Sequence, residues 1–304
     1  MSAHTIKGLR AEFKKAGKFH TPPELAAFLH DLIPSGARDV YDPTCGAGAL
    51  LAQFPDETSK FGQDIDRAAL ADANHLPNFY GQEDDVLTAP AWTDRRFHAI
   101  VANPPFSVPW TPAWDERWFG VPVLPTKGRA DWAFLVHIIH MLADDGTAAV
   151  LQFPGVLYRG GREQQLRQWL VTENLLDRVI AIPGDTFTDT TISTACFVLK
   201  KHRAEGAPIT FEDREHGTSR EVTATEIQAN DYTLSVNTYV QPPEPEREPI
   251  DPWELEQLAR RNAVRQLRKE LRYSRMVAEI EKWPFLPFLD DLSAVIEEER
   301  GDAA

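Results

Sequence analysis

The sequence has little cysteine, no long apolar run, and fewer basic than acidic residues. Only Cys45 and Cys196 occur among 304 residues, far apart and without metal-ligand spacing, so we expect no disulfide framework and no metal site. No run of about eighteen apolar residues exists, which argues against a membrane span. Residues 1–19 lack the apolar core of a signal peptide. These absences predict a protein of the reducing cytoplasm without a membrane partner.

The excess of acidic over basic residues argues against a general affinity for nucleic acid. The formal net charge is −14, and binding to phosphates needs lysine and arginine. The basic residues are unevenly placed, however, because lysines and arginines crowd residues 7–18, and Arg159 and Arg162 lie close together in "YRGGRE". A local basic face on an acidic protein therefore stays open.

Strand-like and helix-like segments alternate between residues 22 and 200. The helix-like segments are 24–33, 48–54, 67–74, 130–146 (ended by Gly146) and 163–174. The strand-like segments are 39–44, 60–66, 98–105, 147–154, 176–184 and 193–201. This alternation predicts an α/β fold whose mostly parallel central sheet is covered by helices on both faces.

The pattern changes after Lys201, and the chain divides into four expected regions. Residues 1–21 form a basic N-terminal helix that leads into the body, which covers 22–240 and closes with a short helix and an extended segment. Residues 241–250 are a linker rich in proline and glutamate. Residues 251–304 are a helical C-terminal extension whose narrow apolar stripe packs either on the body or on a partner.

A glycine turn and two acidic residues indicate a ligand site. In "DVYDPTCGAGALL" a strand leads into Asp42 and then into Gly46 and Gly48, which allow a tight turn and leave room for a ligand. Asp64 ends the next strand, where an acidic side chain typically accepts hydrogen bonds from ribose hydroxyls. Asp85 in "GQEDDVL" is placed to bind an adenine amine, although Asp84 competes for that role. A plain turn and exposed loop aspartates are the alternative interpretation.

The stretch "VANPPF" ends a buried strand in a rigid corner. Pro104 and Pro105 fix the backbone and remove two amide donors, so nearby carbonyls are held in place. Asn103 offers a carbonyl acceptor at the edge of the sheet where ligands bind, and Phe106 offers a flat apolar face. The corner predicts a pocket for a planar group that carries an exocyclic amine, and a tight turn with a core phenylalanine is the alternative.

In combination, these motifs resemble those of the N6-adenine DNA methyltransferases, and specifically the modification (M) subunits of type I restriction–modification systems. "GKFHTPPELAAFL" and "DPTCGAGALL" resemble the cofactor motifs of that family, and "NPPF" resembles its catalytic tetrapeptide. The similarity continues through residues 130–201 and ends with "DYTLSVNTYV", so it covers about residues 15–240. It implies a Rossmann-like S-adenosylmethionine-dependent methyltransferase fold with the C-terminal helical extension described above.

The resemblance also implies roles for individual residues. Phe19, His20 and Thr21 would line the methionine end of S-adenosyl-L-methionine, and Asp42, Thr44, Gly46 and Gly48 would form the turn around it. Asp64 would hold the ribose and Asp85 the adenine. In the catalytic corner of Asn103, Pro104, Pro105 and Phe106, Asn103 and the carbonyl of Pro104 would accept the hydrogens of the target amine, while Phe106 stacks on a flipped adenine. Phe187 is a second candidate for stacking, with a core role as its alternative.

The implied activity is site-specific adenine-N6 methylation of DNA without a metal. The cofactor motif is reached by residue 17, so we expect the chain to lack the N-terminal helical domain with which the family embraces DNA. We therefore expect a specificity (S) subunit, or another DNA-recognition subunit, to bind through the C-terminal helix. A stand-alone methylase of a phage or mobile element, methylation of RNA or protein, and a non-catalytic cofactor-binding paralogue are the alternatives. The role of the Trp- and Pro-rich insertion at 107–132 stays open.

Overall fold

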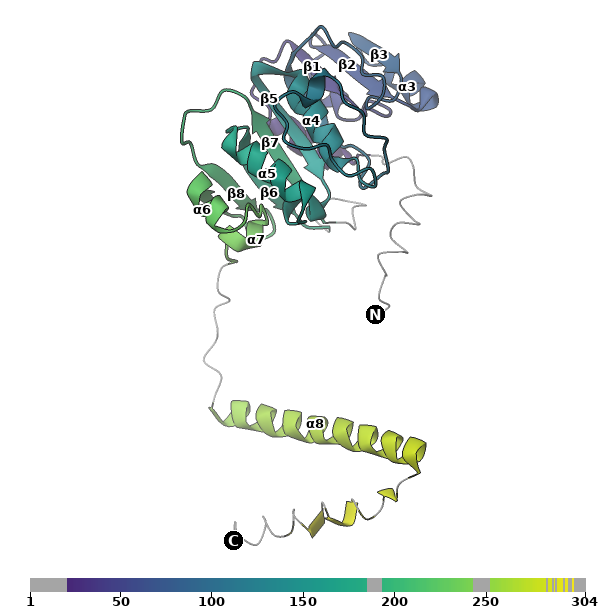
Figure 1. Cartoon of the computed structure of the whole chain (residues 1–304), viewed down its shortest axis with the longest axis vertical. Coiled ribbons are helices and arrows are strands. Elements are labelled where there is room, and N and C mark those ends of the chain that lie inside the picture. The colour runs from purple at the N-terminus through teal and green to yellow at the C-terminus, as the bar shows by residue number, and fades with distance from the viewer. Residues whose placement is uncertain are drawn as a thin grey trace. The chain divides into compact units, whose positions relative to one another are not determined.

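The computed structural model describes residues 21–184, 193–242 and 252–282, together with scattered positions between 284 and 297. Phe19, His20 and Phe187, three of the residues singled out above, lie outside these ranges. The chain divides into two compact units, residues 1–243 and 244–304 (Figure 1). None of the helices that the structure describes is long and apolar enough to cross a membrane.

A nine-stranded sheet forms the centre of the first unit, in the order β3-β2-β1-β4-β5-β7-β6-β8-β9 within the described residues. The strands are β1 (Asp39–Asp42), β2 (Ser59–Asp64), β3 (Phe79–Glu83), β4 (Phe97–Ala102), β5 (Leu142–Gln152), β6 (Leu176–Ile182), β7 (Thr194–Lys200), β8 (Ile209–Asp213) and β9 (Thr218–Val222). All pairings are parallel except those that β7 makes with β5 and β6, and that of β9 with β8. The predicted mostly parallel sheet is thus confirmed.

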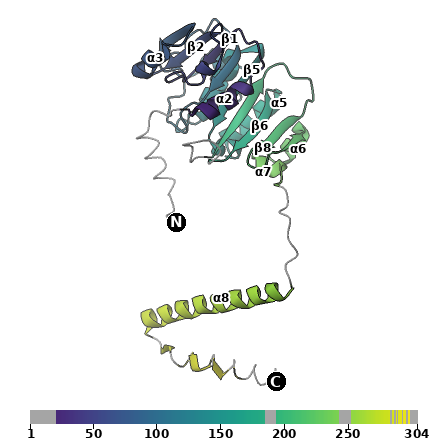
Figure 2. The ribbon, with the colours of Figure 1, turned by 180° about the vertical axis from the view of Figure 1, so that it is seen from behind.

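Helices cover both faces of the sheet, as the alternation of segments predicted. In the described residues they are α2 (Pro23–Asp31), α3 (Arg67–Ala73), α4 (Asp131–Met141), α5 (Arg162–Thr172), α6 (Ala224–Ala229) and α7 (Val236–Tyr239), with 3₁₀ turns η1 (Leu51–Gln53), η2 (Glu116–Trp118) and η3 (Pro154–Leu157). Helices α4 and α5 lie in front of the sheet in Figure 1, and α2 lies in front in the reverse view of Figure 2.

Each face of the sheet has its own hydrophobic core, because successive strand residues point to opposite sides. Ile100 of β4 packs with Leu135 of α4 and Leu166 of α5 on one face. Its neighbours Ala99 and Val101 pack with Leu29 of α2 on the other. Strands buried on both faces hold the loops at their carboxyl ends in fixed positions, and the candidate site is built from those loops.

Three expected segments differ from the structure. The helix expected at 48–54 is only the short turn η1, because Phe54 precedes Pro55 and adopts an extended conformation, as residues before proline do. Helix α4 ends at Met141 rather than at Gly146, because Leu142 already pairs with Phe97 of β4. The extended segment expected before residue 240 contains the helical turn α7. Strands β3, β8 and β9 were not predicted.

The second unit contains helix α8 (Pro252–Glu281), which confirms the predicted C-terminal helix. Pro252 stands at its first position, where a missing amide hydrogen costs no intrahelical bond. Exposed apolar side chains, among them Val264 and Leu267, alternate with many charged ones along its length.

Candidate active site

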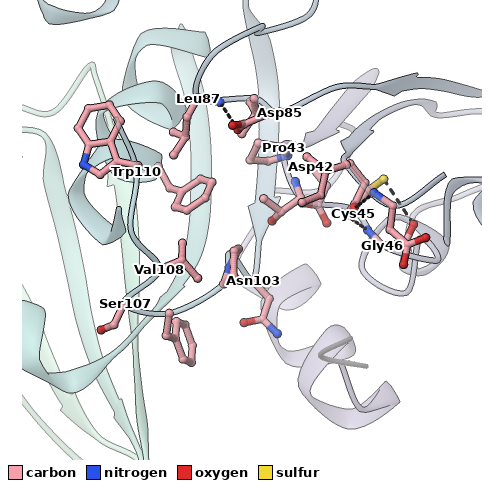
Figure 3. A pocket seen from close by; sticks show the side chains of 18 of the residues that line it. Asp42, Pro43, Cys45, Gly46, Asp85, Leu87, Asn103, Ser107, Val108 and Trp110 are labelled. Atoms are coloured by element: carbon pink, nitrogen blue, oxygen red, sulfur yellow. Dashed lines mark hydrogen bonds between the residues drawn. The ribbon is translucent and has the colours of Figure 1, made fainter. Parts of the chain in front are cut away.

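A cavity of about 1540 Å³ opens at the carboxyl ends of the central strands. The loops that follow β1 to β5 line it, as ligand sites in parallel α/β sheets generally are. Figure 3 shows Asp42, Cys45 and Gly46 on one side and Ser107, Val108 and Trp110 on the other, with Asn103 between them. The cofactor turn and the Asn-Pro-Pro-Phe corner, far apart in sequence, therefore face one space.

The turn after β1 is tied to the end of β2. The backbone amide of Thr44 donates to Asp42 Oδ1 at 3.0 Å, and that of Gly46 donates to Asp64 Oδ2 at 2.8 Å. Gly46 and Gly48 have positive φ values of 50° and 83°, which favour glycine. Gly46 lines the cavity. A Cβ on Gly48 would instead lie 2.6 Å from a side-chain carbon of Leu76, so Gly48 allows close packing behind the turn.

The cavity is strongly acidic near this turn. Asp64 Oδ1 accepts from the amide of Asp66 at 2.8 Å, and Asp85 Oδ1 accepts from the amide of Leu87 at 2.9 Å. The described lining residues include these aspartates: Asp42, Asp64, Asp66, Asp72, Asp84 and Asp85. Asp42, Asp64 and Asp85 form no ion pair within the described part of the chain. This end of the cavity is therefore suited to a cationic ligand.

The carboxyl group of Asp42 has a strongly raised pKa. Its side chain is buried, and burial raises its pKa to about 8, with the nearby charge of Asp64 adding to the effect and the hydrogen bond from Thr44 opposing it. The carboxyl group thus holds a proton at neutral pH as long as no cation lies beside it.

The Asn-Pro-Pro-Phe corner is held from two sides. The side-chain amide of Asn103 donates to Thr21 Oγ1 at 3.2 Å, which leaves its carbonyl oxygen as an acceptor. Ser107 has a φ of 52°, and its backbone amide donates to Asp131 Oδ1 at 3.1 Å. Phe106 lines the cavity with its ring centroid 6.4 Å from that of Phe153. Two aromatic rings therefore line the same cavity as the Asn103 side chain.

The part of the cavity near Phe153 is basic. The guanidinium of Arg159 lies 5.2 Å from the Phe153 ring centroid, and it also lies 3.6 Å from the buried carboxylate of Glu163. Arg129 donates to the other oxygen of Glu163 at 2.9 Å. Both arginines line the cavity, so one carboxylate holds two cations in place, while the aspartates lie along the turns after β1, β2 and β3.

A chain of buried polar groups lies behind the acidic end. Burial, reinforced by the charge of Arg117, holds the pKa of His137 well below its usual value, so the ring is neutral. Arg117 Nη1 lies 3.4 Å from His137 Nδ1, and His137 Nε2 lies 3.1 Å from the Tyr41 hydroxyl. The arginine can only donate, which assigns the ring proton to Nε2. The Tyr41 hydroxyl donates in turn to Gln63 Oε1 at 3.5 Å.

This chain of hydrogen bonds ends next to every carboxylate of the predicted cofactor site. Tyr41 directly precedes Asp42, and Gln63 directly precedes Asp64. Gln63 Nε2 also donates to the carbonyl of Asp84, which directly precedes Asp85, at 3.3 Å, and to that of Ala89 at 2.8 Å. These hydrogen bonds therefore fix the carboxyl ends of β1, β2 and β3 relative to one another.

The Trp- and Pro-rich insertion completes this support. The guanidinium of Arg117, held by Asp115 at 2.6 Å, donates to the carbonyls of Val86 and Leu87 at 2.9 and 2.7 Å. Those carbonyls directly follow Asp85. Trp118 is buried in the core, so this part of the insertion belongs to the body and supports the adenine end of the predicted cofactor site.

A second buried arginine supports the opposite end. Arg167 of α5 donates to the carbonyls of Val156 and Arg159 at 3.1 and 2.8 Å, and to that of Tyr232 at 2.7 Å. Burial lowers its pKa to about 10, which leaves it charged at neutral pH. It thereby fixes the segment that carries Arg159 and follows Phe153.

Most of the predicted site residues converge on the cavity. The described lining includes Thr21, Asp42, Thr44, Gly46, Asp64, Asp85, Asn103, Pro105 and Phe106. Gly48 and Pro104 do not line it, and Phe19 and His20 lie outside the described residues. The roles assigned to all of the site residues remain predictions. Sequence reasoning did not identify Arg117, His137, Arg129 and Phe153, because their roles depend on contacts between distant segments.

Comparison with known proteins matches this chain to members of one family. A model of the family described as "N-6 DNA Methylase" matches residues 6–217. The methylase subunit of the type I restriction enzyme MpnII from Mycoplasma pneumoniae is 34% identical over 241 residues, which cover 68% of this chain and 44% of that protein. The methylase subunit of the type I enzyme HindI from Haemophilus influenzae is 26% identical over 253 residues, which cover 75% and 56%.

A solved structure agrees with these matches. The methyltransferase subunit of a type I restriction–modification system from Streptococcus thermophilus superposes with a TM-score of 0.65 at 27% identity, covering 73% of this chain and 59% of that one. The chain spans about half the length of the curated relatives that it matches. Since the family model covers more than half of its residues, the chain belongs to the N-6 DNA methylase family.

Proposed function

We propose that the chain is an S-adenosylmethionine-dependent DNA methyltransferase that methylates the N6 amine of adenine, of the type I modification-subunit kind. The observation that carries the proposal is one cavity in which three acidic side chains that form no ion pair within the described residues, Asp42, Asp64 and Asp85, face the Asn103 corner. A cationic methyl donor fits the acidic end, and a planar amine fits the corner. The relatives bear the names of type I methylase subunits, which supports this assignment.

The residues present fit S-adenosyl-L-methionine. The cofactor carries positive charge, and Asp42, Asp64 and Asp85 form no ion pair within the described residues. Asp42, Thr44 and Gly46 would hold its methionine end together with Thr21, while Asp64 would hold the ribose and Asp85 the adenine. When bound, the cofactor supplies an electrophilic methyl group on a sulfonium centre.

Asn103 and the Pro104 carbonyl would activate the substrate. The lone pair of an adenine amine is delocalised into the ring, so the nitrogen is a weak nucleophile. Hydrogen bonds from the amine to two fixed acceptors favour a pyramidal nitrogen whose lone pair points at the methyl carbon. Transfer of the methyl group to this lone pair would leave the amine nitrogen with one proton to release to water. Catalysis rests on position and electrostatics.

Phe106 and Phe153 would hold the target base. An adenine within a duplex cannot reach this cavity, so it must rotate out of the helix, and stacking on an aromatic ring offsets part of the lost pairing. Arg129 and Arg159 lie at the same end, where a polyanionic substrate enters. We place the reaction in the cytoplasm, where DNA is present and where Cys45 and Cys196, both free and buried, stay reduced.

A specificity subunit would supply sequence recognition. The curated relatives are named as subunits of restriction enzymes, and the chain is acidic overall. We propose that helix α8, with its exposed apolar side chains, binds this subunit.

Methyl transfer tests the proposal directly. The purified chain, alone and with any specificity subunit, is incubated with duplex DNA and cofactor labelled on the methyl group, and the nucleosides are separated. We expect label in N6-methyladenine. The Asn103→Ala variant should lose about 10²-fold or more of this rate while binding the cofactor as before. Asn230→Ala, which removes an exposed asparagine outside the cavity, is the matched control. Equal activity of Asn103→Ala and the parent would refute the role of Asn103.

A further inference from the structure

Helix α8 carries a straight row of exposed arginines. Arg261, Arg265, Arg268 and Arg272, hereafter the arginine ladder, follow one another at steps of four, three and four residues. This spacing places them on one side of a helix, and all four side chains are exposed. The ladder extends over about 16 Å at the helical rise of about 1.5 Å per residue. The helix has seven basic against five acidic residues, in a chain whose net charge is −14.

The ladder is built of mutually repelling charges. No ladder arginine has an aspartate or glutamate three or four residues away on either side, and Arg265 and Arg268 have only arginine, lysine or uncharged neighbours there. Like charges at this spacing destabilise a helix. Two other arginines of the same helix are paired: Arg260 with Glu256 at 2.6 Å, and Arg275 with Glu279 at 3.2 Å. Within the described residues, no carboxylate forms an ion pair with the ladder.

We propose that the arginine ladder binds the phosphate backbone of duplex DNA. The inference rests on the proposed function, which makes DNA the substrate of this chain. A regular row of positive charges fits a regular polyanion, and the planar guanidinium group forms paired hydrogen bonds with phosphate. Duplex DNA presents one phosphate charge per about 1.7 Å of its axis, whatever its base sequence. Phosphates are therefore available to the arginines of the ladder on any duplex.

The ladder is separate from the apolar side of the helix. Val264, Leu267 and Leu271 also recur at three- and four-residue steps, but on a neighbouring side of α8. A protein subunit that covers those side chains leaves the arginines available for DNA. The ladder thus gives an acidic chain a local contact that holds DNA without reading its sequence.

The test compares two double variants of the full-length protein. Arg265→Gln/Arg268→Gln removes two ladder charges. Arg260→Gln/Arg275→Gln removes two charges that are already paired, and Arg275, three residues after Arg272, lies on the same side of the helix as the ladder, so the two variants differ in the pairing of the charges they remove. Both change the net charge equally, and glutamine keeps the helix propensity of arginine. Binding to a labelled duplex of random sequence is measured by fluorescence anisotropy at salt concentrations from about 50 to 200 mM.

We expect the ladder variant to bind the duplex about tenfold or more weakly at low salt, and its plot of log K against log salt to be shallower by about 2. The paired-arginine control should keep the parent slope. Equal weakening of both variants would reduce the effect to net charge and overturn the proposal. An unchanged slope in the ladder variant would also overturn it. Because methyl transfer is measured separately, DNA binding through the ladder without N6-methyladenine would refute the proposed function alone.

Discussion

The side chain of Asp42 has an unusual protonation state. Its carboxyl group is buried at the end of β1, where it accepts a hydrogen bond from the Thr44 amide. Burial therefore raises its pKa to about 8 in the free protein. A cation in the cavity stabilises the ionised form and lowers the pKa again. Cofactor binding and deprotonation of Asp42 are thus linked.

This linkage has a measurable consequence. Because the free carboxyl group is protonated below pH 8 and the cation prefers the carboxylate, binding at pH 6.5 should release about one proton per cofactor bound. Below about pH 8 the affinity should fall by up to tenfold per pH unit. Isothermal titration calorimetry in buffers of different ionisation enthalpy counts the protons. In Asp42→Asn the release should disappear, and release that persists in this variant would assign the proton to another group.

Two buried arginines support different loops at the carboxyl ends of the strands. Arg117, from the insertion, fixes the carbonyls that follow Asp85, whereas Arg167, from α5, fixes the segment that carries Arg159. Each buried guanidinium satisfies carbonyls that would otherwise lose their hydrogen bonds, at a cost of about 1–3 kcal/mol per group. The two arginines should therefore affect different ligands.

Reciprocal variants separate these effects. Arg117→Met should raise the cofactor Kd about tenfold or more and leave the KM for DNA nearly unchanged, whereas Arg167→Met should do the opposite. The lysine variants keep the charge and should show the same pattern with smaller changes, which guards against a loss of folding. Calorimetry gives the cofactor Kd, and initial rates of methyl transfer give the KM. A parallel loss of both affinities in each variant would indicate a general structural role instead.

The order of the helices and strands could be predicted better than the residues at which they begin and end. Periodicity gave the central strands and helices, since both faces of the sheet are buried and their apolar residues recur regularly. The meeting of Asp42, Asp64 and Asn103 at one cavity could be predicted because strand ends at one sheet edge must converge, whereas their individual roles rest on the resemblance to the family and stay predictions. Arg117 and His137 could not be predicted, because nothing local distinguishes a buried arginine from an exposed one in a loop rich in tryptophan and proline. The end of α4 was misjudged because Leu142 pairs with Phe97, a contact between distant parts of the chain.

The first unit, residues 1–243, should respond to the cofactor as one body. One continuous sheet joins the loops of the cavity, so a ligand that binds only the folded state stabilises the whole sheet. At cofactor concentrations about 100 times Kd we expect about 2.7 kcal/mol of added stability, which corresponds to a rise in Tm of roughly 5–10 °C for a domain of this size. Differential scanning calorimetry at pH 8 measures the shift. The same cofactor should shift Asp42→Asn much less, and an equal shift would contradict the role of the acidic cluster.

The separation of charge within the cavity also distinguishes the two forms of the proposed cofactor. Aspartates line the cavity near the turns after β1, β2 and β3, while Arg159 lies against Phe153. In the proposed reaction, loss of the methyl group would leave the cofactor with one positive charge fewer, and hence with a weaker electrostatic attraction to Asp42, Asp64 and Asp85. We therefore expect the demethylated cofactor to bind less tightly than S-adenosyl-L-methionine, which calorimetry with the two ligands measures.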